Sequence, residues 1–181
     1  MYLEADKDLT VNIDAQTREL SCTGPSDEIN KYLLHTPFAV VDPNAAGKEE
    51  ADYIKTSDSV YNVNLELLKK ADLPANFKRL EKKRLLFKSY SRFPLYPSHH
   101  HFLKKMDSYK PTSLFMNKMK ELTVVDAECL NFADYGYYLM DAIQCQAFQG
   151  GDSNKEFMSF VDANVKDAKV KSYVTDSYIY D

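Results

Sequence analysis

Residues 128–148 read ECLNFADYGYYLMDAIQCQAF and carry the strongest periodic signal in the chain. Apolar side chains recur there after three, four and four residues, at Phe132, Tyr135, Leu139 and Ile143. This is the spacing of one face of an α-helix. The pair Gly150-Gly151 follows and predicts the end of that helix. The stretch therefore predicts a helix with one buried face, and the same period recurs on both sides of it.

Similar patterns follow residue 25, so we expect a succession of about seven helices joined by short connections. The first begins with Ser26 or Asp27 as its N-cap and ends at Pro37. Pro43 and Gly47 indicate a loop or a frayed turn before the next helix. That second helix is expected from residue 57 onward. The later helices are expected over residues 74–97, 99–106, 110–122, 128–148, 155–165 and 166–181.

The predicted core gathers apolar residues from these helices. Its members are Leu67, Phe77, Leu80, Phe115, Leu139, Ile143, Phe157 and Phe160. Short connections favour antiparallel neighbours. The expected fold class is therefore mainly α, an antiparallel helical array or bundle with a small β-hairpin at the N-terminus.

The hairpin is predicted from the stretch LTVNIDAQTRELSCTG, residues 9–24. Leu9, Val11 and Ile13 alternate with polar residues, and DAQT supplies turn residues. We expect the hairpin to run from about residue 2 to residue 23. Two short strands do not form a stable sheet alone. The expected division is a hairpin over residues 1–25, the remnant of a larger β-sandwich, and a helical domain over residues 26–181.

Composition is that of an ordinary globular protein, with 44% hydrophobic and 28% charged residues among 181. The formal charge of −4 provides no attraction to nucleic acid or to an anionic membrane surface. No apolar run approaches the roughly 20 residues that span a bilayer. Met1 leads directly into YLEADKDLTV, which does not read as a signal peptide.

Three cysteines are present, Cys22, Cys129 and Cys145, and none lies in a C-x-x-C motif. If Cys129 and Cys145 lie on one helix, about 24 Å separates them, which exceeds the reach of a disulfide. Three free thiols are therefore expected.

The run SHHHFLKK places His99, His100 and His101 in succession. Consecutive helical side chains point about 100° apart, so the three cannot face one ion. A helical metal pair needs i, i+4 spacing, and the nearby lysines repel a cation. The run predicts an exposed helix start capped by Ser98, and His35 offers no obvious partner.

A basic run, FKRLEKKRLLFK, spans residues 77–88. Its cations are Lys78, Arg79, Lys82, Lys83, Arg84 and Lys88. They favour the solvated side of a helix over a phosphate or nucleic-acid site, because the chain as a whole is acidic.

Four carboxylates surround Cys129 in the sequence, at Asp126, Glu128, Asp134 and Asp141. They are expected on several faces, with neither a histidine nor a glycine-rich turn beside them, so acid–base catalysis is not supported. GGDSN reads as a helix stop followed by an N-cap, not as a phosphate loop. No residue is assigned as catalytic, cofactor-binding or metal-binding.

The first 33 residues carry a family resemblance. Its motifs are Tyr2-Leu3-Glu4, Lys7-Asp8-Leu9-Thr10-Val11, Thr23-Gly24 and Ile29-Asn30-Lys31-Tyr32-Leu33. The chain resembles TlpA-like, thioredoxin-related thiol–disulfide oxidoreductases of anaerobic Gram-negative bacteria. Asp6 stands where that family usually has glycine, a departure that affects only a turn. The helical body and the ending FVDANVKDAKVKSYVTDSYIYD are similar to the helical region before the family's thioredoxin domain.

The resemblance implies that the hairpin forms the last strands of a β-sandwich and that a thioredoxin-like domain follows the helices in the parent protein. It also implies a periplasmic or cell-envelope location. The family's catalytic W-C-x-x-C and its lipoprotein signal are absent from this sequence. No residue of this chain therefore inherits the redox role, and no cofactor is expected.

Two functions remain open. The first is a non-catalytic accessory region of an envelope thiol–disulfide oxidoreductase, which positions the redox domain, dimerises or holds a client protein. The second is a self-contained helical module that binds a protein and in which the hairpin is a local flap. A metal-dependent hydrolase built on the histidine run is a weaker third. We expect the chain to be a piece of a longer protein that self-associates through the hairpin edge or its last helix.

Overall fold

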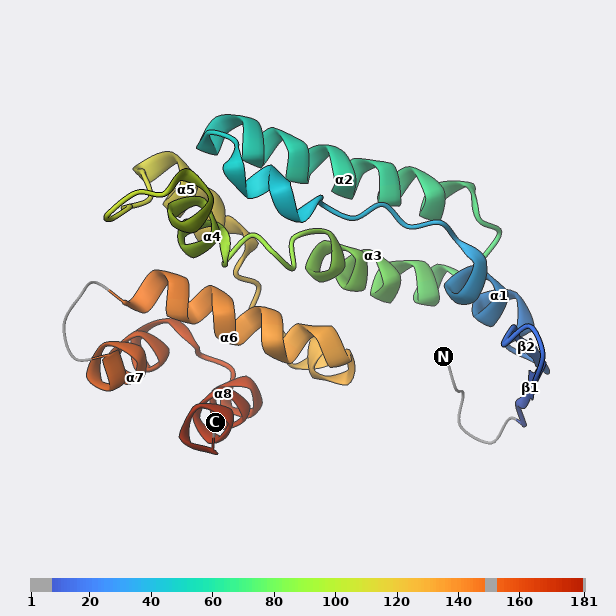
Figure 1. Cartoon of the computed structure of the whole chain (residues 1–181). Coiled ribbons are helices and arrows are strands. Elements are labelled where there is room, and N and C mark those ends of the chain that lie inside the picture. The colour runs from blue at the N-terminus through green and yellow to red at the C-terminus, as the bar shows by residue number, and fades with distance from the viewer. Residues whose placement is uncertain (1–7, 149–152, 181) are drawn as a thin grey trace.

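The computed structural model describes residues 8–148 and 153–180, and helices dominate it (Figure 1). Eight α-helices and one two-stranded sheet lie in this part of the chain. The strands are β1 (Thr10–Ile13) and β2 (Leu20–Thr23). The α-helices are α1 (Asp27–His35), α2 (Glu50–Lys70), α3 (Ala75–Ser89), α4 (Tyr96–Lys104), α5 (Ser113–Leu122), α6 (Ala133–Ala147), α7 (Ser153–Asn164) and α8 (Ala168–Tyr180); two 3-10 helices are η1 (Pro43–Gly47) and η2 (Ala127–Asn131). The predicted fold class, mainly α with a small N-terminal hairpin, is confirmed.

The hairpin is shorter than expected, and residues 1–7 lie outside the described part of the chain. Its strands are antiparallel, with Val11 opposite Cys22 and Ile13 opposite Leu20. The Asp14 carboxylate shapes the turn by accepting backbone hydrogen bonds from residues 16 and 17. Strand β2 contacts α1 and buries Cys22 there. Ile13 at the other end of the same face is 69% exposed.

Helix α6, which contains the periodic stretch, is the central element of the array. It packs against α3, α5, α7 and α8, and η2 lies at its start. Helices α2 and α3 form an antiparallel pair above it, and α5 contacts both α2 and α6 (Figure 1). The predicted helix stop at Gly150-Gly151 and the first residues of GGDSN lie outside the described residues.

Most of the predicted core is confirmed. The buried members are Phe77, Phe115, Leu139, Ile143 and Phe157. Phe160 is half-buried and packs against the main core. Leu67 and Leu80 were predicted wrongly, because both are half-buried and lie in neither apolar cluster. In α2 the inward position belongs to Leu68, which is 5% exposed.

The buried face of α2 was predicted wrongly because three of its buried residues are polar, namely Glu50, Ser57 and Asn64. Asn64 is fully buried, and its side chain both accepts from the backbone N–H of Ala39 (2.8 Å) and donates to the carbonyl of that residue (3.0 Å). It also donates to the Ser89 hydroxyl (2.9 Å). Ser57 is 1% exposed and donates to the Tyr53 carbonyl. Asn64 thereby fastens the extended segment before η1 to both α2 and α3.

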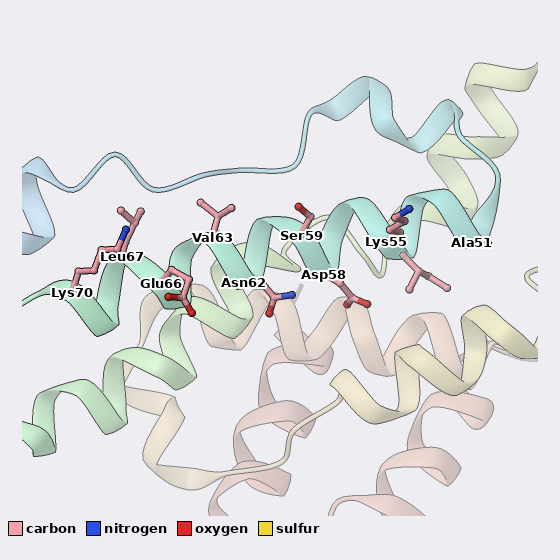
Figure 2. A pocket seen from close by; sticks show the side chains of 10 residues that line it. Ala51, Lys55, Asp58, Ser59, Asn62, Val63, Glu66, Leu67 and Lys70 are labelled. Carbon is pink, nitrogen blue, oxygen red and sulfur yellow. The ribbon is translucent and has the colours of Figure 1, made fainter.

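The start of α2 was also predicted wrongly, since the helix begins at Glu50 and not at residue 57. Pro43 and Gly47, read as loop breakers, bound the 3-10 helix η1. Proline suits the first turn of a helix, and the Asp42 carboxylate accepts from the next free backbone N–H. The outward face of α2 is drawn in Figure 2, where side chains from Ala51 to Lys70 line a shallow hollow of about 640 Å³.

Buried tyrosines join the helices to the segments that connect them. Tyr53 and Tyr96 stack with centroids 4.4 Å apart, and their hydroxyls donate to the carbonyls of Arg92 and Lys48. Tyr135 of α6 donates to the carbonyl of Val124 in the segment that follows α5, and Tyr138 donates to the carbonyl of Leu122, the last residue of α5.

None of the described helices combines the length and the apolar character needed to cross a membrane.

We predict that Gly136→Ala destabilises the chain, although alanine is the better helix former by about 1 kcal/mol. A Cβ at Gly136 would lie 1.9 Å from the Tyr173 hydroxyl oxygen and 2.8 Å from its Cζ, where α6 meets α8. Overpacking costs about 1–3 kcal/mol in a closed core. Tyr173 is 40% exposed and its ring can swing aside at the loss of its contact with α6, so the expected net destabilisation is small. Urea denaturation of the variant should therefore give a lower free energy of unfolding than that of the wild type.

Tyr173→Ala provides the control. In the Tyr173→Ala background the ring that obstructs a Cβ at position 136 is absent. Gly136→Ala should then raise the free energy of unfolding, because alanine has the higher helix propensity. A stabilising effect of Gly136→Ala in the wild-type background would contradict the close contact.

Candidate functional site

The histidine run lies in α4, which begins at Tyr96, so Ser98 is inside the helix and does not cap it. His100 was predicted to be exposed, and that is wrong, because it is 4% exposed. Its Nδ1 lies 2.8 Å from the Ala46 carbonyl oxygen and so carries the proton. Its ring packs against Tyr96 and Tyr109, with centroids 4.9 and 4.7 Å away. Among residues 8–148 and 153–180, no three His, Cys, Asp or Glu side chains gather as metal ligands.

Glu50, which the sequence analysis did not single out, is buried beside this histidine. Its carboxylate accepts from the Thr112 backbone N–H (2.8 Å) and from the hydroxyls of Thr112 and Tyr109. Burial pushes the pKa of Glu50 up, but these donors outweigh it and leave the pKa below its ordinary value. Glu50 therefore stays ionised and joins the start of α2 to the start of α5.

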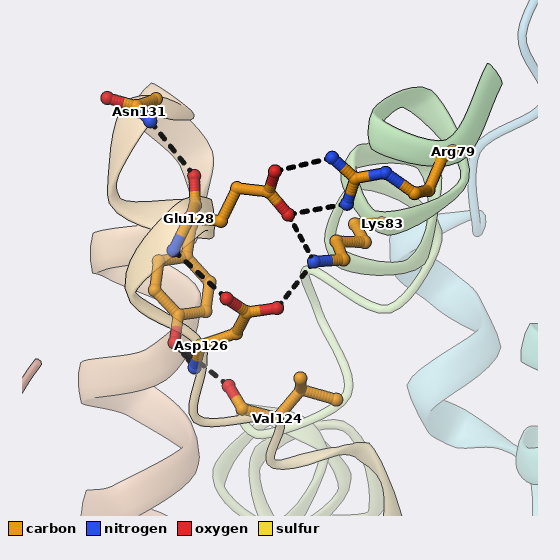
Figure 3. A network of polar contacts seen from close by, with 7 residues as sticks. Arg79, Lys83, Val124, Asp126, Glu128 and Asn131 are labelled. Carbon is orange, nitrogen blue, oxygen red and sulfur yellow. Dashed lines mark hydrogen bonds and ion pairs between the residues drawn. The ribbon is translucent and has the colours of Figure 1, made fainter. Parts of the chain in front are cut away.

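The basic run and two of the predicted carboxylates form one network (Figure 3). Arg79 of α3 makes a bidentate pair with Glu128, at 2.5 and 2.6 Å. Lys83 of α3 lies 2.5 Å from an Asp126 oxygen and 2.6 Å from a Glu128 oxygen. The expectation that these cations are simply solvated, and that the carboxylates lie on separate faces, is wrong for these four residues.

Electrostatics identify this network as structural. The hydrogen bonds from Arg79 and then Lys83 lower the pKa of Glu128 to about 2, and the bond from Lys83 lowers that of Asp126. A general acid or base at neutral pH needs a pKa near 7. The network instead fastens η2 to α3, and Tyr135 of α6 supports it by accepting from the Asp126 backbone N–H.

Other cations of the basic run are also engaged. Arg84 makes two 2.6 Å hydrogen bonds to Glu81, whose side chain is 2% exposed. The Lys88 ammonium lies 4.6 Å from the centre of the Phe38 ring. Lys82 faces solvent, as predicted for the whole run.

The three cysteines are free thiols in the structure. Cys129 lies in η2 and not on the same helix as Cys145. Burial raises the pKa of both thiols to about 11. Cys22 belongs to strand β2 and is buried. Because the thiolate is the reactive species, Cys129 and Cys145 are poorly suited to thiol–disulfide exchange.

The remaining two predicted carboxylates, Asp134 and Asp141, lie on α6 beside two hollows of the surface. One hollow of about 460 Å³ lies between α6, the end of α3 and the segment before η1; its lining includes Val40, Pro43, Arg92, Asp134 and Tyr137. A second hollow of about 590 Å³ lies between α6 and the segments around α4 and α5; its lining includes Leu95, Tyr109, Pro111, Met116, Cys145 and Phe148. Asp141 lines both. We call the two hollows together the α6 groove.

Asp141 is the distinctive group of the α6 groove. Burial raises its pKa above the ordinary value of an aspartate. Within the described residues it has no ion-pair or hydrogen-bond partner, in contrast to Asp126. The α6 groove thus combines apolar and proline-rich wall segments with charged side chains, among them the carboxyls of Asp134 and Asp141. Of these two, Asp141 is the carboxyl whose pKa burial raises, so a donor from a bound molecule would stabilise it. Sequence reasoning named Asp141 but could not place it, because the walls come from segments far apart in the chain.

We predict that acid weakens the Figure 3 network. Because the pKa of Glu128 is lower in the folded chain (about 2) than its ordinary value (4.5), its contribution is complete above pH 4.5 and is lost as the pH falls toward 2. Glu128→Gln should therefore lower the urea midpoint at pH 7 and have little effect at pH 2. Glu19→Gln is the control, because Glu19 is exposed and forms no ion pair within the described part. Equal effects of Glu128→Gln at both pH values would contradict the network.

We also predict slow thiol chemistry in the folded chain. With a pKa near 11 instead of 9, Cys129 and Cys145 hold about a hundredfold less thiolate at neutral pH than ordinary cysteines. Titration with a chromogenic disulfide at pH 7.5 should be slow in the native state. Three thiols should react rapidly after denaturation without reductant. A rapidly reacting thiol in the native chain would contradict the assignment.

Comparison with known proteins leaves the family open, since no protein-family model, curated protein or solved structure matches the chain.

Proposed function

We propose that this chain is a non-catalytic module that holds an extended segment of a client protein in the α6 groove. The observation that carries the proposal is the meeting of two apolar hollows at Asp141. An extended chain needs a long surface with apolar contacts and a few polar anchors. Asp141 provides such an anchor for a backbone N–H or a basic side chain of the client.

The protonation states and the burial of the potential catalytic groups support a binding role. Glu128 and Asp126 are held ionised by cations, and Cys129 and Cys145 are held protonated by burial. His100 is buried with its Nδ1–H donated to a carbonyl. These groups stabilise the fold and are not poised to react with a substrate.

We further propose that the module serves as an accessory region of an envelope thiol–disulfide oxidoreductase. The sequence resemblance of residues 1–33 suggests this role, and the exposed face of the hairpin is consistent with it. Val11, Ile13 and Leu20 are 36%, 69% and 39% exposed on a sheet of only two strands. Such a surface gains stability by contacting another protein surface. The alternative is a self-contained module with the same client groove, in which the hairpin is a local flap.

Aggregation of insulin tests the client groove, because reduction by dithiothreitol releases B chains that aggregate. We expect the chain to delay the rise in light scattering. Tyr137→Asp combined with Phe148→Asp places charges at the two ends of the groove, at side chains that are 79% and 40% exposed. Loss of two apolar anchors should raise the amount of chain needed for the same delay about tenfold.

Phe102→Asp is the matched control, because Phe102 is 78% exposed and lines neither part of the α6 groove. It should behave like the wild type. Equal loss in the control and the groove variant, or no delay by the wild type, would overturn the proposal. Insulin with dithiothreitol too dilute to reduce it measurably tests the non-catalytic assignment. A catalytic chain would use that dithiol as its electron source and release insulin thiols faster than the sample without the chain does.

A further inference from the structure

We propose that a second copy of this chain docks antiparallel on the outward face of α2, so that a two-fold axis passes between residues 60 and 61. This goes beyond the proposed client groove and uses a separate surface, since no residue of the α2 face lines the α6 groove. We define the α2 face by the residues that line the hollow drawn in Figure 2. They are Ala51, Ile54, Lys55, Asp58, Ser59, Asn62, Val63, Glu66, Leu67 and Lys70.

The α2 face is open along its whole length. All ten lining residues come from α2 itself, and Figure 2 shows Lys55, Asn62 and Glu66 on the same side of the helix. Another hollow, of about 530 Å³, continues the surface at the start of the helix and adds Asp52. Val63 is 48% exposed on this face. The surface therefore has the shape of a long, shallow strip that suits another helix.

The charges of the strip are complementary only to an antiparallel copy. Lys55 and Glu66 lie at equal distances on either side of the midpoint of α2. An antiparallel second copy thus sets Lys55 against Glu66 twice, as a two-fold interface requires. A parallel copy would set Lys55 against Lys55 and Glu66 against Glu66, and like charges oppose association.

The same arrangement brings a second pair of opposite charges together. Asp52 and Lys70 lie at the two ends of α2. In the antiparallel pair, Asp52 of one copy faces position 69 of the other, which is next to Lys70. Glu66 already accepts from Lys69 at 2.5 Å and retains room for a second donor, because a carboxylate has two oxygens. Lys55 has no ion-pair partner within the described residues, and eleven residues, about 16 Å, separate it from Glu66 in its own chain.

The centre and the edges of the strip also suit a helix. Ser59 and Asn62 at the centre are small enough for close approach, while Ile54, Val63 and Leu67 flank them. A strip about 30 Å long and about 10 Å wide offers about 300 Å² on each copy, which is below the range of stable interfaces and fits a weak, transient pair. We therefore expect a reversible pair that forms at high micromolar concentration.

Sedimentation velocity over a range of concentrations tests the proposal with charge reversal. The wild type should shift from monomer to dimer as concentration rises. Lys55→Glu and Glu66→Lys each replace two attractive contacts with two repulsive ones, so each should weaken association at least about tenfold. Lys82→Glu on α3 is the control, since Lys82 is exposed and lies outside the α2 face, and it should associate like the wild type.

Mixing the two single variants gives the decisive result. In a mixed pair, the glutamate introduced at position 55 of one variant faces the lysine introduced at position 66 of the other. The second contact retains its native Lys55 and Glu66, so both contacts become attractive. The mixture should dimerise although each variant alone does not.

Three outcomes would each overturn the antiparallel pair: a monomeric wild type, a dimer that tolerates both reversals, or a mixture that fails to associate. Circular dichroism should confirm that both variants keep the helical content of the wild type.

Discussion

The fold depends on the hydrogen bonds of buried tyrosine hydroxyls. Tyr53, Tyr96, Tyr135 and Tyr138 are at most 2% exposed, and a hydroxyl buried that deeply is costly unless it has a partner. In each case the partner is a backbone carbonyl, in a connecting segment for Tyr53, Tyr96 and Tyr135 and at the last residue of α5 for Tyr138. One side chain therefore both fills the core and fixes the end of an element or the connection beside it. The sequence contains 13 tyrosines and no tryptophan, which suits this dual use.

The polar side chains that suggested chemistry in the sequence follow the same logic. Glu50, Glu81 and His100 are all buried, and each is satisfied by a specific donor or acceptor on another turn or element. Removing one partner of such a pair leaves an uncompensated polar group in a low-dielectric interior. These residues are therefore constrained by packing, and the surface left for function lies where the helices do not cover one another.

Local periodicity was sufficient to predict the fold class and the five buried core residues, because a helical stripe depends only on neighbours along the chain. It failed for α2, where the polar residues Ser57 and Asn64 occupy inward positions. Ser57 is buried with a hydrogen bond inside its own helix, and only Asn64 has tertiary hydrogen bonds, to residues 25 positions away. It also failed for the network of Lys83 and Asp126, which are 43 residues apart. Ion pairs between distant segments produce no periodic pattern in the sequence. A basic run whose side chains form such ion pairs therefore cannot be distinguished, from the sequence, from a run that only faces solvent.

The contrast between Asp126 and Asp141 shows where the remaining binding capacity lies. Both carboxyls are partly withdrawn from water, but Asp126 has Lys83 to compensate for the lost hydration, whereas burial alone acts on Asp141 and raises its pKa. A carboxyl left in that condition gains free energy when a donor reaches it. Because Asp141 lies where two partly apolar hollows meet, the occupant we propose is an apolar segment that carries a hydrogen-bond donor. That coupling favours an extended polypeptide over a free cation as the occupant of the α6 groove.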